Sequence, residues 1–316
     1  MDAPVDLSAL RRKPGVVRLH GHRGARGVMP ENTLPGFEFA LACGVEILEL
    51  DVHFTRESIP VITHNPRLSA DIVRDENGEW IEAPGPMVRE LSLAELQAFD
   101  VGGMRDGTLY GARFPDQAFL SDVPTPRLTD LAAILARPEH GHVWLNLEIK
   151  SSPGHPEYTP PVPDMIRSLL EALDSHDLAP RTLVQCFDWR VLVELHRQFP
   201  IIARSFLSEY PEDGDHPEAN VYEGSPWMAG LSLADHGGSM PDLVAAAGGE
   251  VWSPNFRDVT PHDLARAREL ELVVNVWTVN RQEDIDRMIA LGVDGIITDY
   301  PGRVQRRLKA HGLEWA

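Results

Sequence analysis

The feature that most constrains the fold is a regular alternation of short apolar runs with amphipathic segments along almost the whole chain. The apolar runs predict eight strands, at residues 16–22, 45–51, 142–149, 182–187, 201–207, 250–254, 272–278 and 295–298. The amphipathic segments predict helices at residues 34–42, 128–136, 164–173, 189–198, 242–247, 261–269 and 282–291. Such an alternation favours a parallel sheet with right-handed crossovers, because each helix returns the chain to the same end of the sheet.

Eight strand–helix units predict an α/β fold of the closed (β/α)₈ TIM-barrel type, although an open doubly wound sheet would give a similar pattern. The length of 316 residues suits one barrel, so we expect a single domain over residues 1–316. Residues 65–126, rich in Pro, Gly and acidic residues, are too long for an ordinary connection, and we interpret them as a cap inserted after the second strand. A second insertion, at about residues 208–238, is interpreted as a surface loop.

The balance of charge excludes some partners. The chain has 48 acidic and 29 basic residues, a formal net charge of −19, and such a surface repels nucleic acid and anionic membranes. No apolar run approaches the roughly 18 residues that a membrane span requires, and the first residues lack the apolar centre of a secretory signal. We therefore expect a cytoplasmic protein with no nucleic-acid partner and no stable membrane association; its oligomeric state is left open.

Three carboxylates lie at the ends of two predicted strands. Glu49 and Asp51 share one face of the second strand, because side chains alternate along a strand, and Glu148 lies near the end of the third. In a barrel, such inward-facing groups point into the mouth. Crowded carboxylates repel one another and lose hydration unless a cation holds them together. Any one of them alone would more simply form a salt bridge, but the three together predict one divalent cation, Mg²⁺ or Ca²⁺, which prefer oxygen ligands.

Two histidines and two basic residues surround these carboxylates in the sequence. His22 ends the first strand, and His64 follows a short extended run after the second. Imidazoles titrate near neutral pH, so the two histidines are candidates for an acid/base pair. Arg23 and Lys150 are candidates for binding a phosphate, since an arginine can bind two oxygens at once.

Five motifs in order resemble those of the glycerophosphodiester phosphodiesterases. Within residues 22–65, His-Arg-Gly is followed by Pro-Glu-Asn-Thr, Glu-x-Asp-Val and a second histidine. The later motifs are LEIK, QCFD, NVWTVN and GVDGIITDYP. The resemblance implies a (β/α)₈ barrel with a cap after the second strand. It also implies metal-dependent hydrolysis of a small-molecule glycerophosphodiester to sn-glycerol 3-phosphate and an alcohol, by attack of water or of the substrate's own 2-hydroxyl.

Carried over by position, the resemblance implies a role for nine residues. The metal ligands would be Glu49, Asp51 and Glu148. The acid/base pair would be His22 and His64. The phosphate contacts would be Arg23 and Lys150. The glycerol side of the pocket would be lined by Trp277, with Phe187 nearby, although ordinary core packing is the alternative for both aromatic residues.

Two positions depart from the family pattern, and two other functions stay open. Asn65 stands where the family usually has Asp, which puts the orientation and basicity of His64 in question, and Cys186 stands where the family has Ser. A small packing residue is the simpler interpretation of Cys186. The first alternative function is a phospholipase-type or sphingomyelinase-like phosphodiesterase. The second is a barrel that binds glycerophosphodiesters without hydrolysing them, to which only Asn65 points.

Overall fold

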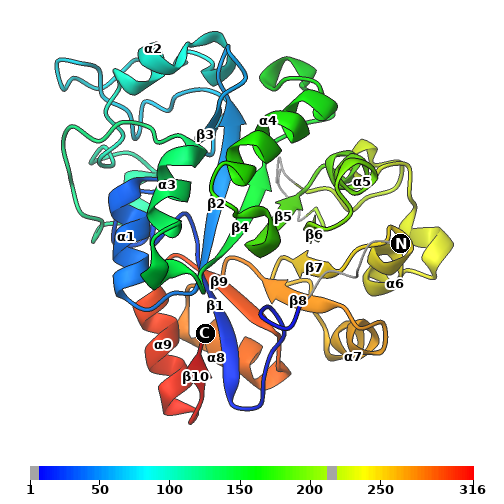
Figure 1. Ribbon diagram of the computed structural model, residues 1–316. Coiled ribbons are helices and arrows are strands. Elements are labelled where there is room, and N and C mark those ends of the chain that lie inside the picture. The colour runs from blue at the N-terminus through cyan, green and yellow to red at the C-terminus, as the bar shows by residue number, and fades with distance from the viewer. Residues whose placement is uncertain (1–6, 212–218) are drawn as a thin grey trace.

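A computed structural model describes residues 7–211 and 219–316, and its central feature is a closed barrel of eight parallel strands (Figure 1). The strands are β1 (Val16–Gly21), β2 (Ile47–Phe54), β4 (Trp144–Ile149), β5 (Thr182–Cys186), β6 (Ala203–Ser208), β7 (Val251–Pro254), β8 (Val273–Val276) and β9 (Gly295–Thr298). Because β1 pairs with β2 on one side and with β9 on the other, the ring is closed. The predicted TIM barrel is confirmed, and the open sheet is excluded.

Helices between the strands cover the outside of the barrel. They are α1 (Leu34–Ala42), α3 (Leu128–Leu135), α4 (Val162–Asp174), α5 (Trp189–Gln198), α6 (Met240–Ala246), α7 (Pro261–Glu269), α8 (Gln282–Leu291) and α9 (Pro301–Ala310). Thr33 and Thr260 cap α1 and α7 with their side chains, and a proline lies in the first turn of each helix. Both features are typical of helix N-termini. Among the described residues, four α-helices and strands lie outside the predicted set: α9, α2 (Leu93–Gln97), the two-residue β10 (Glu314–Trp315) and the antiparallel β3 (Pro60–Ile62).

The barrel interior changes from apolar to polar along the strands. At the N-terminal ends of the strands, Leu7 and Leu10 pack against a buried apolar layer formed by Ile47, Leu183, Ala203, Val251 and Val273. Two residues further along the same strands, the inward positions carry polar side chains, among them Glu49, Gln185, Ser205, Ser253 and Asn275. The apolar layer closes one end of the barrel, so the polar residues face the C-terminal mouth, where the active sites of this fold lie.

The segment between β3 and α3 forms a compact unit beside this mouth (Figure 1). It contains α2 (Leu93–Gln97) and a small apolar core of its own, in which Leu68, Val73, Val88 and Leu96 pack with Val61 of β3. The predicted cap at residues 65–126 coincides with this segment. The predicted insertion at 208–238 is described only in part, because residues 212–218 lie outside the described residues.

No helix within residues 7–211 and 219–316 combines the length and the apolar character that crossing a bilayer requires.

Candidate active site

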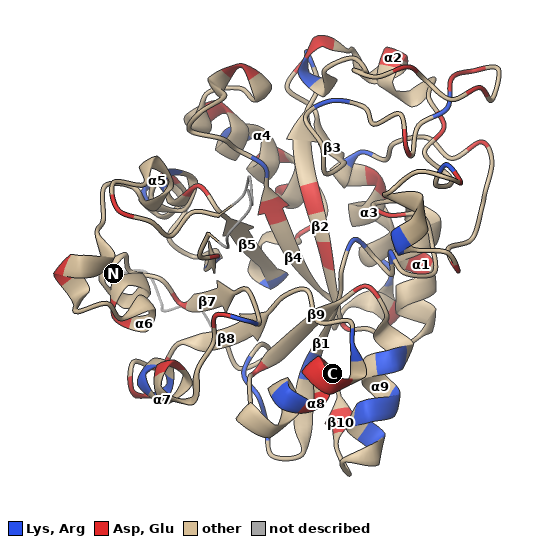
Figure 2. Cartoon of the chain, turned by 180° about the vertical axis from the view of Figure 1, so that it is seen from behind, with Lys and Arg blue, Asp and Glu red and all other residues tan. Residues whose placement is uncertain are grey.

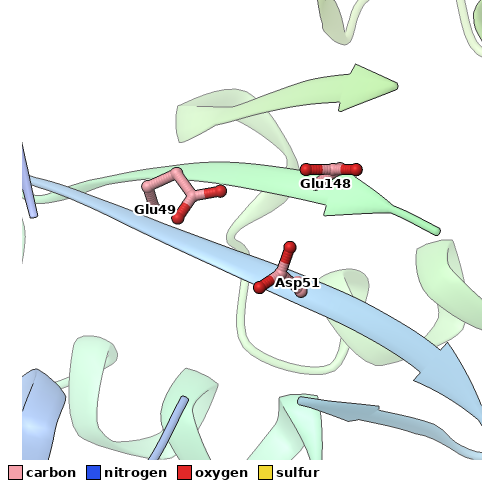
Figure 3. A group of neighbouring side chains, drawn as sticks. All are labelled: Glu49, Asp51 and Glu148. Atoms are coloured by element: carbon pink, nitrogen blue, oxygen red, sulfur yellow. The ribbon is translucent and has the colours of Figure 1, made fainter. Parts of the chain in front are cut away.

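Three buried carboxylates meet at the mouth of the barrel (Figure 3). Glu49 and Asp51 lie on β2 and Glu148 on β4, and one ligand oxygen from each lies within 4.8 Å of the others. The parallel register sets Asp51 opposite Glu148, which brings the carboxylates of two strands together. In the view of Figure 2, they form red segments on strands that are otherwise tan. The sequence prediction that these three side chains converge is confirmed.

Arg23 is held against this cluster by its backbone as well as by its side chain. Its φ of 50° lies in the left-handed region, and this conformation directs its backbone N–H to Oε2 of Glu49 at 2.9 Å. Its guanidinium Nε lies 3.0 Å from Oδ2 of Asp51. The next residue must be glycine: Gly24 has a φ of 86°, and a Cβ there would lie 2.9 Å from the backbone of Gly36.

Lys150 bridges Asp51 and Glu148. Its Nζ lies 3.1 Å from Oδ1 of Asp51 and 2.7 Å from Oε1 of Glu148. Burial alone would raise the pKa of Asp51, but Lys150 and Arg23 outweigh burial and hold that pKa well below its usual range. For Glu49 the balance is reversed: burial, together with repulsion from Asp51 and Glu148, raises its pKa well above the usual value.

Carboxylates outnumber cations in the buried ion-pair network around the cluster. Among the described residues, this network joins five carboxylates with three cations. Its members are Glu31, Glu49, Asp51, Glu148, Asp299, Arg23, Arg26 and Lys150. A buried anionic excess is costly unless it is compensated. The all-oxygen donor set and the raised pKa of Glu49 both fit a hard dication.

His22 is anchored by an acidic residue from the far end of the chain. Its Nδ1 lies 2.6 Å from Oδ1 of Asp299, directly after β9, and its Nε2 lies 3.8 Å from Oε2 of Glu49. A carboxylate accepts, so Nδ1 carries the proton and Nε2 is the nitrogen that can accept one. Burial and the nearby Arg26 charge lower the pKa of His22 to about 4. Burial would raise the pKa of Asp299, but Arg26 and His22 outweigh it and keep that pKa well below its ordinary value.

His64 is positioned by local contacts instead. Its Nδ1 lies 2.8 Å from Oδ1 of the adjacent Asn65, and its backbone carbonyl lies 3.1 Å from Nε2 of His53 on β2. With the amide oxygen as acceptor, this ring also carries its neutral-state proton on Nδ1. The two histidines therefore share a tautomer but have different partners, a carboxylate for His22 and an amide for His64.

A cavity of about 430 Å³ joins these groups. Eight of the nine predicted site residues line it, and the ninth, Asp51, is connected to it by ion pairs with Arg23 and Lys150. On one wall, Trp277 and Phe187 make an edge-on contact with ring centroids 5.4 Å apart. The cap segment contributes five further lining residues, Asn65, Ser69, Asp71, Tyr110 and Arg113.

The sequence model of the glycerophosphoryl diester phosphodiesterase family matches residues 22–303, which include every residue of this site. The chain belongs to this family. The predicted family and the predicted enzyme class, a glycerophosphodiester phosphodiesterase, are confirmed.

Individual relatives cover nearly the whole chain. The glycerophosphodiester phosphodiesterase of Caldanaerobacter subterraneus subsp. tengcongensis is 25% identical over 89% of this chain and 93% of its own length. The crystal structure of a candidate glycerophosphoryl diester phosphodiesterase from Silicibacter pomeroyi DSS-3 is 44% identical, covers 99% of this chain and 100% of that one, and has a TM-score of 0.88. An Oleispira antarctica phosphodiesterase, solved in complex with the product sn-glycerol-3-phosphate, is 21% identical and has a TM-score of 0.66. The match covers 93% of this chain and 97% of that one, and it shows a shared fold.

Several residues of this phosphodiesterase site were not predicted from the sequence. Arg26 pairs with Asp299 at 2.8 Å, and both lie within motifs that carry the family resemblance. Asn32, which directly precedes the N-cap Thr33 of α1, donates from Nδ2 to Oδ2 of Asp51 at 2.8 Å. Tyr110 of the cap donates its hydroxyl to Oε2 of Glu31 at 2.5 Å, a contact that no local sequence pattern indicates.

Cys186 behaves as a packing residue. Its Sγ donates to the backbone carbonyl of Ile149 at 2.9 Å, and the side chain is buried. Burial raises the pKa of this thiol well above its usual value, so the nucleophilic thiolate is disfavoured. The structure gives this cysteine no part in the chemistry of the site.

Proposed function

We propose that this protein hydrolyses glycerophosphodiesters to sn-glycerol 3-phosphate and an alcohol, with one divalent cation held by Glu49, Asp51 and Glu148. The observation that carries the proposal is the buried cluster of three carboxylates, which opens into a cavity lined by two histidines. The structural relative that holds sn-glycerol-3-phosphate supports the choice of product. Mg²⁺ and Ca²⁺ both suit the oxygen donors.

Positive charge at the cavity would bind the phosphate. Arg23 and Lys150 line the cavity while paired with carboxylates, so each is fixed in place before substrate arrives. Fixed donors stabilise the charge that accumulates on phosphoryl oxygens in the transition state without having to reorganise. A divalent cation held by Glu49, Asp51 and Glu148 would add Lewis-acid stabilisation of the developing phosphate charge.

The two imidazoles would move the protons. Both are held through Nδ1, by Asp299 and by Asn65, so Nε2 is the nitrogen of each that exchanges a proton with substrate. One ring, neutral, accepts at Nε2 a proton from the attacking oxygen, water or the 2-hydroxyl of the substrate. The other ring enters as the imidazolium, protonated on both nitrogens, and donates its Nε2 proton to the departing alkoxide. The carboxylate of Asp299 stabilises the imidazolium form of His22.

The remaining walls would recognise glycerol. Trp277 and Phe187 supply an apolar surface for its carbons, and Trp277 is fixed by donating from Nε1 to the carbonyl of Ser253 at 2.8 Å. Ser69 and Asp71 of the cap lie at the same cavity and can bind hydroxyls. In this proposal the cap shapes access to the phosphate.

The direct test is an assay for released glycerol 3-phosphate over a panel of glycerophosphodiesters, with and without EDTA. We expect turnover that EDTA abolishes and that added Mg²⁺ or Ca²⁺ restores. Vesicles of phosphatidylcholine and of sphingomyelin serve as competing substrates. Turnover of the vesicles in preference to the glycerophosphodiesters, or binding without any released product, would refute the proposal.

A further inference from the structure

A second cavity, which we call the side chamber, adjoins the first. Its volume is about 320 Å³, against about 430 Å³ for the main cavity. His64, Glu148 and Lys150 line both cavities, and Phe187 forms part of both walls. The two cavities therefore meet at the groups proposed to act on the phosphate.

Aromatic residues from three separate connections form the walls of the side chamber. Tyr158 comes from η4 (Pro156–Tyr158) after β4, Phe187 follows β5, and Trp227 comes from η6 (Pro226–Met228) after β6. His155 stacks on Tyr158 with ring centroids 4.7 Å apart and an interplanar angle of 12°. Connections after consecutive barrel strands thus bring aromatic surface to one side of the reaction centre.

Local contacts hold these walls in place. Ser225 caps η6 by accepting the backbone N–H of Trp227 at 3.3 Å. Thr159, next to Tyr158, accepts a hydrogen bond at its carbonyl from Arg89 of the cap. Two of the aromatic side chains of the chamber, Trp227 and Tyr158, therefore lie on or next to backbone that is fixed by hydrogen bonds.

The position of the chamber indicates which part of a substrate it holds. A phosphodiester has two ester arms, which leave the phosphorus in different directions. If the main cavity holds the glycerol arm beside Trp277, the alcohol arm extends from the phosphate at Lys150 and Glu148 into the side chamber. This step rests on the proposed function.

The chemistry of the walls indicates which alcohol fits. Aromatic faces attract a cation, and among aromatic side chains tryptophan does so most strongly. The positive charge of Lys150 is balanced by its ion pairs with Asp51 and Glu148. The hydroxyl of Ser151 is occupied by donation to Asp188 at 2.7 Å, so it does not add a donor aimed at a polyol. The net charge of −19 favours a cationic group further.

We infer that the side chamber binds the alcohol arm of the substrate and favours an alcohol that carries a quaternary ammonium group, such as choline. A quaternary ammonium makes no hydrogen bonds, and contact with several aromatic faces replaces its hydration. An alcohol without a cationic group lacks this part of the attraction.

The test compares three substrates that share the glycerol 3-phosphate arm. They are glycerophosphocholine, its neutral isostere glycerophospho-3,3-dimethylbutanol, and glycerophosphoglycerol. We expect the wild-type kcat/KM to be about 5–30-fold higher for glycerophosphocholine than for the isostere, as expected for cation–π contacts in a partly desolvated chamber. We expect Trp227→Ala to reduce the preference for choline over glycerol by about 10-fold, and Trp227→Phe to retain most of it.

Two further variants make the result decisive. Tyr158→Leu removes a second aromatic wall and should also reduce the preference, so a Trp227→Ala protein that fails to fold leaves the test intact. Tyr222→Ala changes an aromatic residue that is 43% exposed and does not line the chamber, and it should keep the wild-type preference. Equal rates for choline and its isostere, or unchanged preference in both wall variants, would overturn the inference. A wild-type protein without activity on any of the three substrates would instead refute the proposed function.

Discussion

The two sides of the active site support their histidines in different ways. On one side, His22 ends a barrel strand and is held by Asp299, a residue 277 positions away along the chain that also pairs with Arg26. On the other side, His64 begins the cap segment and is held by Asn65, the next residue. The first side is thus built into the closure of the barrel, whereas the second is set by local chain geometry.

The difference lies in the group that holds Nδ1, a carboxylate for His22 and an amide for His64. A carboxylate next to an imidazole stabilises the protonated ring and fixes its tautomer, whereas an amide fixes the tautomer without adding charge. His22 is also the more enclosed, with burial and Arg26 lowering its pKa to about 4 and Asp299 opposing that shift. We therefore expect the partner of His22 to matter more for catalysis than the partner of His64.

The largest effect is expected from removing either ring. His22→Ala and His64→Ala should each lower kcat/KM on glycerophosphocholine by about 10²–10⁴-fold, because each removes an acid/base group. His262→Ala, an exposed histidine on α7, is the matched control and should retain wild-type activity. Near-normal turnover in a folded His22→Ala or His64→Ala protein would remove that histidine from the mechanism.

The next effect is expected at the partner of His22. Asp299→Asn should lower kcat/KM by about 10–100-fold, since it removes the charge that stabilises the imidazolium while keeping the shape of the side chain. A thermal melt must accompany the kinetics, because Asp299 also accepts hydrogen bonds from Arg26 and Asn280.

The effect at Asp299 can be assigned to His22 by a double-mutant cycle. In the His22→Ala background, Asp299→Asn should cost no more than about 2–3-fold, because its catalytic partner is already gone. A loss as large as in the wild-type background would mean that Asp299 acts on the fold and not through His22.

The smallest effect is expected at the partner of His64. Asn65→Ala should lower kcat/KM by about 2–10-fold, the range for loss of one neutral hydrogen bond that orients a side chain. Asn77→Ala, an exposed amide elsewhere in the cap, is the control. A loss at Asn65 equal to or larger than that of Asp299→Asn would contradict the proposed difference between the two sides.

The fold was largely predictable because its signals are local. Alternating apolar runs and amphipathic segments identify the eight barrel strands, and the hydroxyl caps at Thr33 and Thr260 mark helix starts. The strand boundaries were less certain: β2 runs from Ile47 to Phe54, three residues beyond the predicted end. That extension carries His53, whose Nε2 contacts the His64 carbonyl.

The site was predictable only where polar residues recur at every second position of a strand and so share one face. Spacing alone placed Glu49 and Asp51 on one face, and the strand ends brought Glu148 to them. The contacts of Asp299 with His22 and of Tyr110 with Glu31 join residues 277 and 79 positions apart. Such pairs depend on how the barrel closes and where the cap folds. A short stretch of sequence does not carry this information.

The measurement that tests the central claim most directly is a calorimetric titration of Mg²⁺ or Ca²⁺ into protein freed of metal by a chelator. We expect saturable binding of one ion per chain for the wild type and severe weakening in Asp51→Asn, since the variant loses a ligand charge. No saturable binding to wild-type protein that still hydrolyses glycerophosphocholine without metal would contradict the claim that a captured dication makes this cluster of carboxylates tolerable.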